Sequence, residues 1–119
     1  MVLLIDNDDD FRIGLAENLR DDGYAVDDYS GPAQLPPLEQ LTGVDVVVTD
    51  YQMPGEDGLA FAERLHRVHP QLPVVIVTAY STAHLEGAVR ARSFLRLQQK
   101  PVDYRQLSGL LSELASVPR

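Results

Sequence analysis

The chain has 119 residues, a net charge of -8 and a hydrophobic fraction of 45%. This length suits one domain with one core, and the acidic balance argues against a basic patch that binds nucleic acid. The absence of cysteine excludes disulfides and thiolate metal sites, and no apolar run approaches the roughly 20 residues of a membrane span. Met1 leads directly into an apolar run without a basic segment, so we expect no signal peptide and a cytoplasmic location.

Short apolar runs alternate with helical patterns along the chain. Strand patterns cover residues 2–5, 24–29, 44–49, 74–78 and 94–99, and the second of them is weak. Helical patterns cover residues 11–19, 59–68, 82–92 and 104–114. Between the second and third strands, two prolines inside residues 31–38 exclude a long helix, so we expect a loop and a short helical turn near Pro37. The sequence therefore predicts an α/β fold of five strands and about five helices, with a doubly wound parallel sheet covered on both faces.

Polar residues follow four of these strands. Asp6 and Asn7 follow the first strand, and Asp50, Thr78 and Lys100 come at the ends of the third, fourth and fifth. The carboxyl ends of parallel strands lie at one edge of the sheet, where ligands bind. Asp50 can act as a nucleophile there. Phosphoryl transfer to a carboxylate needs positive charge, which Mg²⁺ (or Mn²⁺) on one or two carboxylates and a lysine supply, and a hydroxyl donates to a phosphoryl oxygen.

At these positions the chain resembles the receiver domain of two-component response regulators. The resemblance is carried by four motifs, at residues 4–8 (Leu-Ile-Asp-Asn-Asp), 49–58 (Thr-Asp-Tyr-Gln-Met-Pro-Gly-Glu-Asp-Gly), 77–79 (Val-Thr-Ala) and 100–101 (Lys-Pro). It covers essentially all 119 residues. It implies one receiver domain over residues 1–119, a flavodoxin-like strand order 2-1-3-4-5 and a cis bond between Lys100 and Pro101.

The resemblance also implies the role of each site residue. Asp50 would accept a phosphoryl group from the phosphohistidine of a sensor histidine kinase or a histidine phosphotransfer protein. The implied metal ligands are Asp6, Asn7, Asp50 and the Gln52 backbone carbonyl. The implied phosphoryl-binding and switch residues are Thr78, Ala79, Lys100 and Leu97. Gln52 and Tyr80 would tune dephosphorylation, so the domain would assist its own phosphorylation and dephosphorylation without being an enzyme.

The sequence departs from the family pattern in four places. Asn7 replaces the second acid of the metal pair, so one charge is missing, and Leu97 replaces an aromatic switch residue. Residues 91–93 replace a Gly-Ala pair, and the region of the second helix carries the prolines. We expect weaker Mg²⁺ binding and a modest conformational switch. We expect this switch on the face formed by residues 82–114, which is also the expected dimer or effector contact.

Other interpretations of the same residues remain open. A pseudo-receiver would bind a partner without phosphorylation, which Asn7 and Leu97 favour. A small aspartyl-phosphate hydrolase would need a second acid two residues after Asp50, where Gln52 stands. Asp6, Asp8, Asp10 and Glu17 have the spacing of a calcium loop, but the glycine position holds Phe11. We expect residues 8–10 to cap and begin a helix instead. We expect His66, His69 and His84 at the surface, and residues 116–119 either end the protein or begin a linker to an effector.

Overall fold

The computed structural model describes residues 1–115 and contains one parallel sheet. Its strands are β1 (Val2–Ile5), β2 (Val26–Tyr29), β3 (Val46–Asp50), β4 (Val74–Thr78) and β5 (Leu95–Gln99). They lie in the order β2-β1-β3-β4-β5, and every neighbouring pair is parallel. This order confirms the expected doubly wound architecture. The expectations for residues 116–119 lie outside the described residues.

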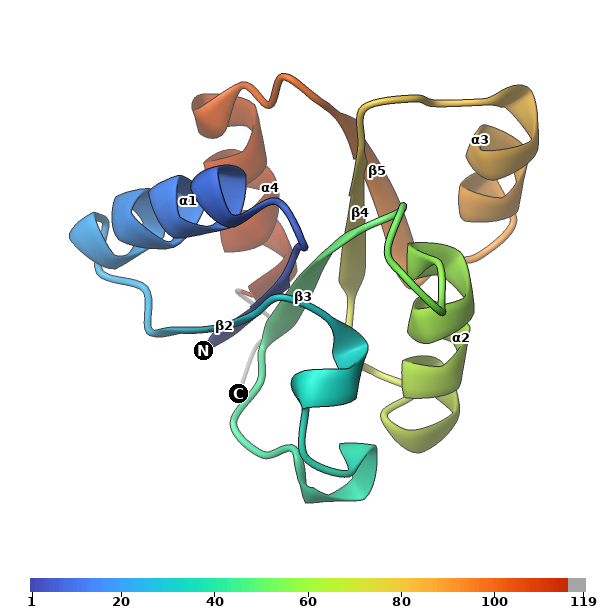
Figure 1. The fold of residues 1–119 in the computed structure, drawn as a ribbon, viewed down its shortest axis with the longest axis horizontal. Coiled ribbons are helices and arrows are strands. Elements are labelled where there is room, and N and C mark those ends of the chain that lie inside the picture. Colours follow the sequence, from blue (N-terminus) through green and yellow to red (C-terminus); the bar gives the residue numbers. More distant parts are fainter. Residues whose placement is uncertain (116–119) are drawn as a thin grey trace.

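Four α-helices cover the two faces of this sheet within residues 1–115. They are α1 (Asp9–Asp21), α2 (Gly58–Val68), α3 (Ala83–Arg90) and α4 (Tyr104–Ala115). Helices α1 and α4 lie on one face, and α2 and α3 lie on the other (Figure 1). Successive strand residues point to opposite faces, so the β3 side chains Val46 and Val48 join the core under α1 and α4, whereas Val47 joins the other core. Because both faces are covered, the three central strands β1, β3 and β4 are buried throughout, whereas the edge strands β2 and β5 are partly exposed.

Three helices begin with a side-chain cap close to the carboxyl ends of the strands. Asp8 accepts a hydrogen bond from the Phe11 N–H at 3.1 Å, Asp57 accepts one from Ala60 at 2.8 Å, and Thr82 accepts one from Leu85 at 3.1 Å. Each cap satisfies one of the free N–H groups in the first turn and fixes where the helix starts. The structure therefore uses Asp8 as the N-cap of α1, as expected.

The connection between β2 and β3 contains two short 3₁₀ turns instead of a full helix. They cover Pro32–Gln34 and Leu38–Gln40, and Pro37 is the N-cap of the second. The expected turn near Pro37 is confirmed, but the total of about five helices was too high, because the prolines leave only these turns here. The ring of His69 donates from Nε2 to the Leu38 carbonyl at 2.6 Å and ties the second turn to the end of α2.

The histidine expectation was correct for His84 alone, which is exposed. His69 is half-buried and makes the bond to Leu38, and His66 stacks on Phe94 with ring centroids 3.8 Å apart. The lack of paired metal ligands suggested surface positions for both histidines, but it gave no information on how their rings pack against neighbouring residues.

No helix within residues 1–115 is long and apolar enough to span a bilayer.

Candidate functional site

The site forms at the edge of the sheet where the carboxyl ends of the strands lie. Asp50 is the last residue of β3 and is 8% exposed, and Asp6, directly after β1, is 1% exposed. Lys100 follows β5 and is the single lysine of the chain. Its Nζ lies 3.1 Å from Asp6 Oδ2 and 3.9 Å from Asp50 Oδ1. The sheet therefore brings together the two carboxylates and the ammonium group that the sequence predicts at this edge.

The electrostatic environment of Asp50 is balanced between opposing effects. Burial, followed by the nearby negative charge of Asp6, raises the pKa of Asp50 to about 6. The positive charge of Lys100 and the backbone N–H of Tyr51 act in the opposite direction and favour the carboxylate. A pKa near 6 leaves Asp50 mostly ionised at neutral pH, yet basic enough to be an effective nucleophile.

Asp6 is held by groups from three parts of the chain. Its Oδ1 accepts from the Asp8 backbone N–H at 2.8 Å, and its Oδ2 accepts from Lys100. Arg12 donates from Nη1 to the Asp6 backbone carbonyl at 2.8 Å and also pairs with Asp28 of β2 at 3.0 Å. Sequence reasoning did not assign Arg12 a role, because this contact exists only once α1 lies against β1 and β2.

Lys100 has a second neighbour that the sequence did not predict. Its Nζ lies 4.3 Å from the centroid of the Phe11 ring, which is a cation–π contact. The Lys100 backbone N–H donates to the Thr78 carbonyl at 2.7 Å, and the bond to Pro101 is cis, as the family resemblance implied. Phe11, which begins the predicted helical pattern of residues 11–19, therefore lies against the lysine side chain.

Asn7 places its amide group between two oxygen atoms of the site. Its Nδ2 donates to Asp50 Oδ2 at 2.9 Å and to the Gln52 backbone carbonyl at 3.1 Å. The two ends of an amide are nearly isosteric, so the orientation follows from these partners, both of which are acceptors. The structure therefore brings all four expected metal-site residues, Asp6, Asn7, Asp50 and Gln52, to one place.

The donor set suits a magnesium ion. Mg²⁺ uses one or two carboxylates and retains several waters, and Asp6, Asp50 and the Gln52 carbonyl supply such oxygens. Within residues 1–115, no group of three or more His, Cys, Asp or Glu side chains forms a metal cluster. The calcium-loop interpretation was wrong, because Asp8 caps α1 and Glu17 lies within that helix.

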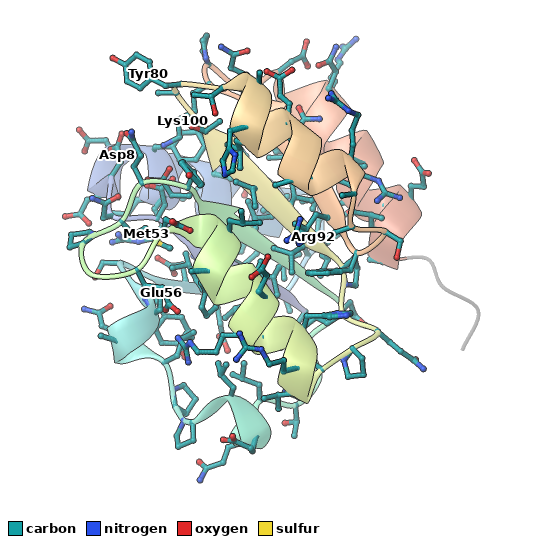
Figure 2. The ribbon with its side chains drawn as sticks, turned by 90° about the vertical axis from the view of Figure 1, so that its right-hand side faces the viewer. Asp8, Met53, Glu56, Tyr80, Arg92 and Lys100 are labelled. Carbon is teal, nitrogen blue, oxygen red and sulfur yellow. The ribbon has the colours of Figure 1, made fainter. Side chains whose placement is uncertain are left out.

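The residues expected to respond to phosphorylation lie on the other side of Asp50. Thr78 ends β4 and is 1% exposed, but its hydroxyl bonds with the backbone of Tyr80: it accepts from the N–H and donates to the carbonyl, both at 3.1 Å. Ala79 is exposed, and Leu97 is half-buried against the core under α2 and α3. In Figure 2, Tyr80 projects outwards, and the residue is 71% exposed.

Gly58 is a site-building residue that the sequence did not single out beyond its motif. A Cβ at this position would lie 2.3 Å from the Asp50 carbonyl oxygen and 2.9 Å from Tyr51 Cα. The Gly58 N–H donates to the Tyr51 carbonyl at 2.7 Å, so the start of α2 touches the end of β3. Arg64 of α2 pairs with Glu56 at 2.8 Å and so holds the loop between β3 and α2, which carries Gln52. In the sequence, the glycine of the Asp57-Gly58 dipeptide is the feature that indicates such a close approach of two backbone segments.

Comparison with known proteins agrees with this fold. The family model for the response regulator receiver domain matches residues 2–112. The chain is 31% identical over 115 residues to the sensor kinase CckA of Brucella abortus, covering 95% of this chain and 12% of that protein. It is 36% identical over 106 residues to the DNA-binding transcriptional regulator NtrC of Escherichia coli, covering 87% of this chain and 21% of that protein. The chain thus spans a small part of the length of these relatives.

Solved structures show the same architecture. A response regulator receiver protein from Sinorhizobium medicae superposes with a TM-score of 0.84 at 25% identity, covering 98% of this chain and 94% of that chain. The receiver domain of the hybrid histidine kinase CckA gives a TM-score of 0.80 at 20% identity, with coverages of 97% and 98%.

The fold and the edge site define a doubly wound signalling domain with a buried aspartate next to a lysine. The chain belongs to the response regulator receiver domain family of two-component systems. This is a family of signalling domains and not a classical enzyme family.

Proposed function

We propose that this receiver domain accepts a phosphoryl group on Asp50 from the phosphohistidine of a sensor histidine kinase or a histidine phosphotransfer protein. The observation that carries the proposal is the buried Asp50 carboxylate with Lys100 Nζ 3.9 Å away and Asp6 beside that lysine. Residues 1–119 act as one receiver unit in this proposal. Its proposed donors are signalling kinases, so we place the exchange in the cytoplasm.

Each residue of the site has a defined task in the transfer. An Asp50 carboxylate oxygen attacks phosphorus, the new O–P bond forms, and the P–N bond to the donor histidine breaks. Lys100 offsets negative charge that builds up on the phosphoryl oxygens, because its ammonium already points at this edge. Mg²⁺ (or Mn²⁺), held by Asp6, Asp50 and the Gln52 carbonyl, would supply further positive charge when bound. In this way the domain assists its own phosphorylation and its own dephosphorylation.

The experiment is phosphorylation by a small donor. Incubation with phosphoramidate or acetyl phosphate and Mg²⁺ should add a single phosphoryl group, measured by intact mass, and Asp50→Asn should abolish the addition. Asp27→Asn is the matched control, because Asp27 is an exposed carboxylate on β2, away from the site. Stoichiometric labelling of Asp50→Asn would contradict the assignment.

A pseudo-receiver is the second candidate, favoured by Asn7 and Leu97. Such a domain would bind its partner equally well before and after incubation with the donor, and no phosphoryl mass would appear. A phosphorylated wild-type protein with unchanged partner binding would therefore mean that the chemistry is retained without signalling.

We also propose that the signal is read on the face formed by residues 82–114, as an effector contact or a homodimer. Capture of a phosphoryl oxygen by Thr78 requires the hydroxyl to leave the Tyr80 backbone, and this loop leads directly into α3. NMR shifts on adding beryllofluoride, a mimic of the phosphoryl group, should concentrate on residues 82–114. Large shifts confined to residues 11–19 of α1 would contradict this proposal.

A further inference from the structure

The amide group of Asn7 holds the place that the proposed cation would need. Its Nδ2 donates to Asp50 Oδ2 at 2.9 Å and to the Gln52 carbonyl at 3.1 Å. These two oxygens belong to the set that fits Mg²⁺. A nitrogen bearing two partly positive hydrogens thus bridges the same oxygens that a cation would bridge, and one of its hydrogen bonds is to a charged group.

An aspartate at this position would behave differently. Asp6 already lies close enough to Asp50 for its negative charge to raise the pKa of Asp50, and a third carboxylate would add repulsion that only a cation relieves. Asn7 instead satisfies the metal-free site with two hydrogen bonds. The same amide also has an oxygen, and rotation by half a turn about its terminal bond directs that oxygen to the place of the nitrogen.

We propose that Asn7 is a two-position latch on the cation site. With Nδ2 inwards, the amide closes the metal-free site by bridging Asp50 and Gln52. With Oδ1 inwards, it becomes a ligand to Mg²⁺. Metal binding must therefore break two hydrogen bonds before it gains a neutral ligand, so the domain takes up Mg²⁺ only at higher concentrations than an acid at position 7 would allow. This inference rests on the proposed function, because it concerns the same site.

The decisive variant is Asn7→Ala, since Asn7 is exposed and its removal leaves the core intact. If the amide served only as a ligand, alanine would weaken Mg²⁺ binding. If the amide is a latch, alanine removes the competing hydrogen bonds, and a water replaces the lost ligand at little cost because Mg²⁺ retains waters readily. We expect Asn7→Ala to bind Mg²⁺ equally well or up to about tenfold more tightly, which is the range set by one or two hydrogen bonds.

Isothermal titration of Mg²⁺ into the wild-type protein, Asn7→Ala, Asn7→Asp and Asn18→Ala measures these affinities. Asn18→Ala is the matched control, because it removes an exposed amide from the far end of α1 and should leave the affinity unchanged. Asn7→Asp should bind most tightly. Weaker Mg²⁺ binding by Asn7→Ala than by the wild-type protein would overturn the latch. A lack of Mg²⁺ binding by both the wild-type protein and Asn7→Ala would overturn it too.

NMR of the Asn7 side chain gives a second readout that needs no phosphoryl donor. Without Mg²⁺, the Asn7 NH₂ protons should be shifted downfield from those of a free amide and should exchange slowly with water. Saturating Mg²⁺ should move them to free-amide values. Free-amide values at both Mg²⁺ concentrations would overturn the latch. Neither measurement involves phosphorylation. If the latch proposal fails while Asp50 is still phosphorylated, the proposed function stands. If both Mg²⁺ measurements agree with the latch but Asp50 is not phosphorylated, the proposed function fails and the latch stands.

Discussion

The two sides of Asp50 differ in how ready they are for chemistry. On the side of Asp6 and Asn7, the carboxylate oxygens of Asp6 accept from Lys100 and from the backbone, and the Asn7 amide already contacts Asp50. On the side of Thr78, the buried hydroxyl is instead bonded to the backbone of its own loop. The acceptor half of the site is therefore assembled in advance, whereas the half that would report phosphorylation must first break local hydrogen bonds.

This difference has a consequence for energetics. The assembled side lowers the stability of the fold, because it holds two buried carboxylates beside a single lysine. The other side costs little, since the Thr78 hydroxyl and the Tyr80 backbone satisfy each other. A ligand shifts a conformational equilibrium only by its different affinity for the two states, so the Thr78 bonds set part of the cost of switching.

Among the residues that support Asp50, the largest effect should come from Lys100→Met, which removes the positive charge that serves the assembled side. We expect phosphorylation by phosphoramidate to slow by about 10²-fold, the usual cost of losing one preorganised charged donor at a reaction centre. Intact mass against time gives the rate. Arg105→Met is the control, because it removes an exposed cation from α4, and its rate should match the wild type. A Lys100→Met rate within twofold of the wild type would contradict the role of the ammonium group.

The pH dependence of unfolding should reveal how much stability the buried Asp50 carboxylate costs the fold. A carboxyl group whose pKa rises on folding favours the folded state at low pH, and this contribution is lost as the pH rises through the folded pKa. For Asp50 this stabilising contribution is lost as the pH rises from about 4 to about 6. Asp50→Asn carries no such group, so at pH 7.5 it should be more stable than the wild type by on the order of 2 kcal/mol.

Urea unfolding at several pH values checks this prediction. The stability difference between Asp50→Asn and the wild type should be largest above pH 7 and should shrink as the pH falls towards 4. Asp27→Asn, which makes the same charge change on an exposed part of β2, should show a much smaller difference. Equal or lower stability of Asp50→Asn at pH 7.5 would mean that Lys100 and Tyr51 outweigh burial and Asp6.

The third prediction concerns the ring that supports Lys100. Phe11→Leu keeps the apolar packing of α1 but removes the π face 4.3 Å from Nζ. Contacts of this kind contribute about 0.5–1 kcal/mol at exposed sites, so phosphorylation should slow by about threefold. Phe11→Tyr retains the ring and should behave as the wild type.

NMR separates this effect from a general disturbance of α1. The single lysine of the chain gives one set of side-chain signals, and the protons near its Nζ should lose their ring-current shift in Phe11→Leu but keep it in Phe11→Tyr. Unchanged lysine shifts in Phe11→Leu would show that the ring does not position the ammonium group.

The sequence predicted the strand ends and the polar residues at them, because this information is local. The run Val46-Val47-Val48 alternates between two covered faces and stops at Asp50, and the run before Asp6 behaves in the same way. Once the strands are parallel, all their carboxyl ends must meet at one edge. The four expected metal-site residues therefore converged without any detail of side-chain packing.

The supporting residues could not be predicted because their contacts join distant segments. The role of Phe11 depends on a lysine 89 positions later, and the role of Gly58 depends on how closely α2 approaches the end of β3. The 3₁₀ turns before β3 show a different limit. The prolines excluded a long helix there, but the bond from His69 that ties the second turn to α2 appears only in the folded chain.

The smallest effect should come from Tyr80, which follows the unassembled side. The family resemblance implied that Tyr80 tunes dephosphorylation, and a bulky ring at this position can obstruct the attack of water on the aspartyl phosphate. In the structure Tyr80 is 71% exposed and its side chain projects outwards, while its backbone holds the Thr78 hydroxyl. The ring therefore shields the mouth of the site only when it swings inwards, and Tyr80→Ala should accelerate loss of the phosphoryl group by a modest factor.

We expect this factor to be about two to three, since moving an exposed side chain over the site costs mainly rotamer freedom. The measurement is the decay of phosphorylated protein after removal of the donor, followed by intact mass. Tyr80→Phe is the matched control, because it keeps the ring and the backbone bonds to Thr78 and should decay at the wild-type rate. If phosphorylated Tyr80→Phe decays as fast as phosphorylated Tyr80→Ala, the hydroxyl and not the bulk of the ring protects the phosphoryl group. If phosphorylated Tyr80→Ala decays no faster than the wild type, access of water is controlled on the assembled side alone, where the Asn7 amide and the Gln52 loop border Asp50.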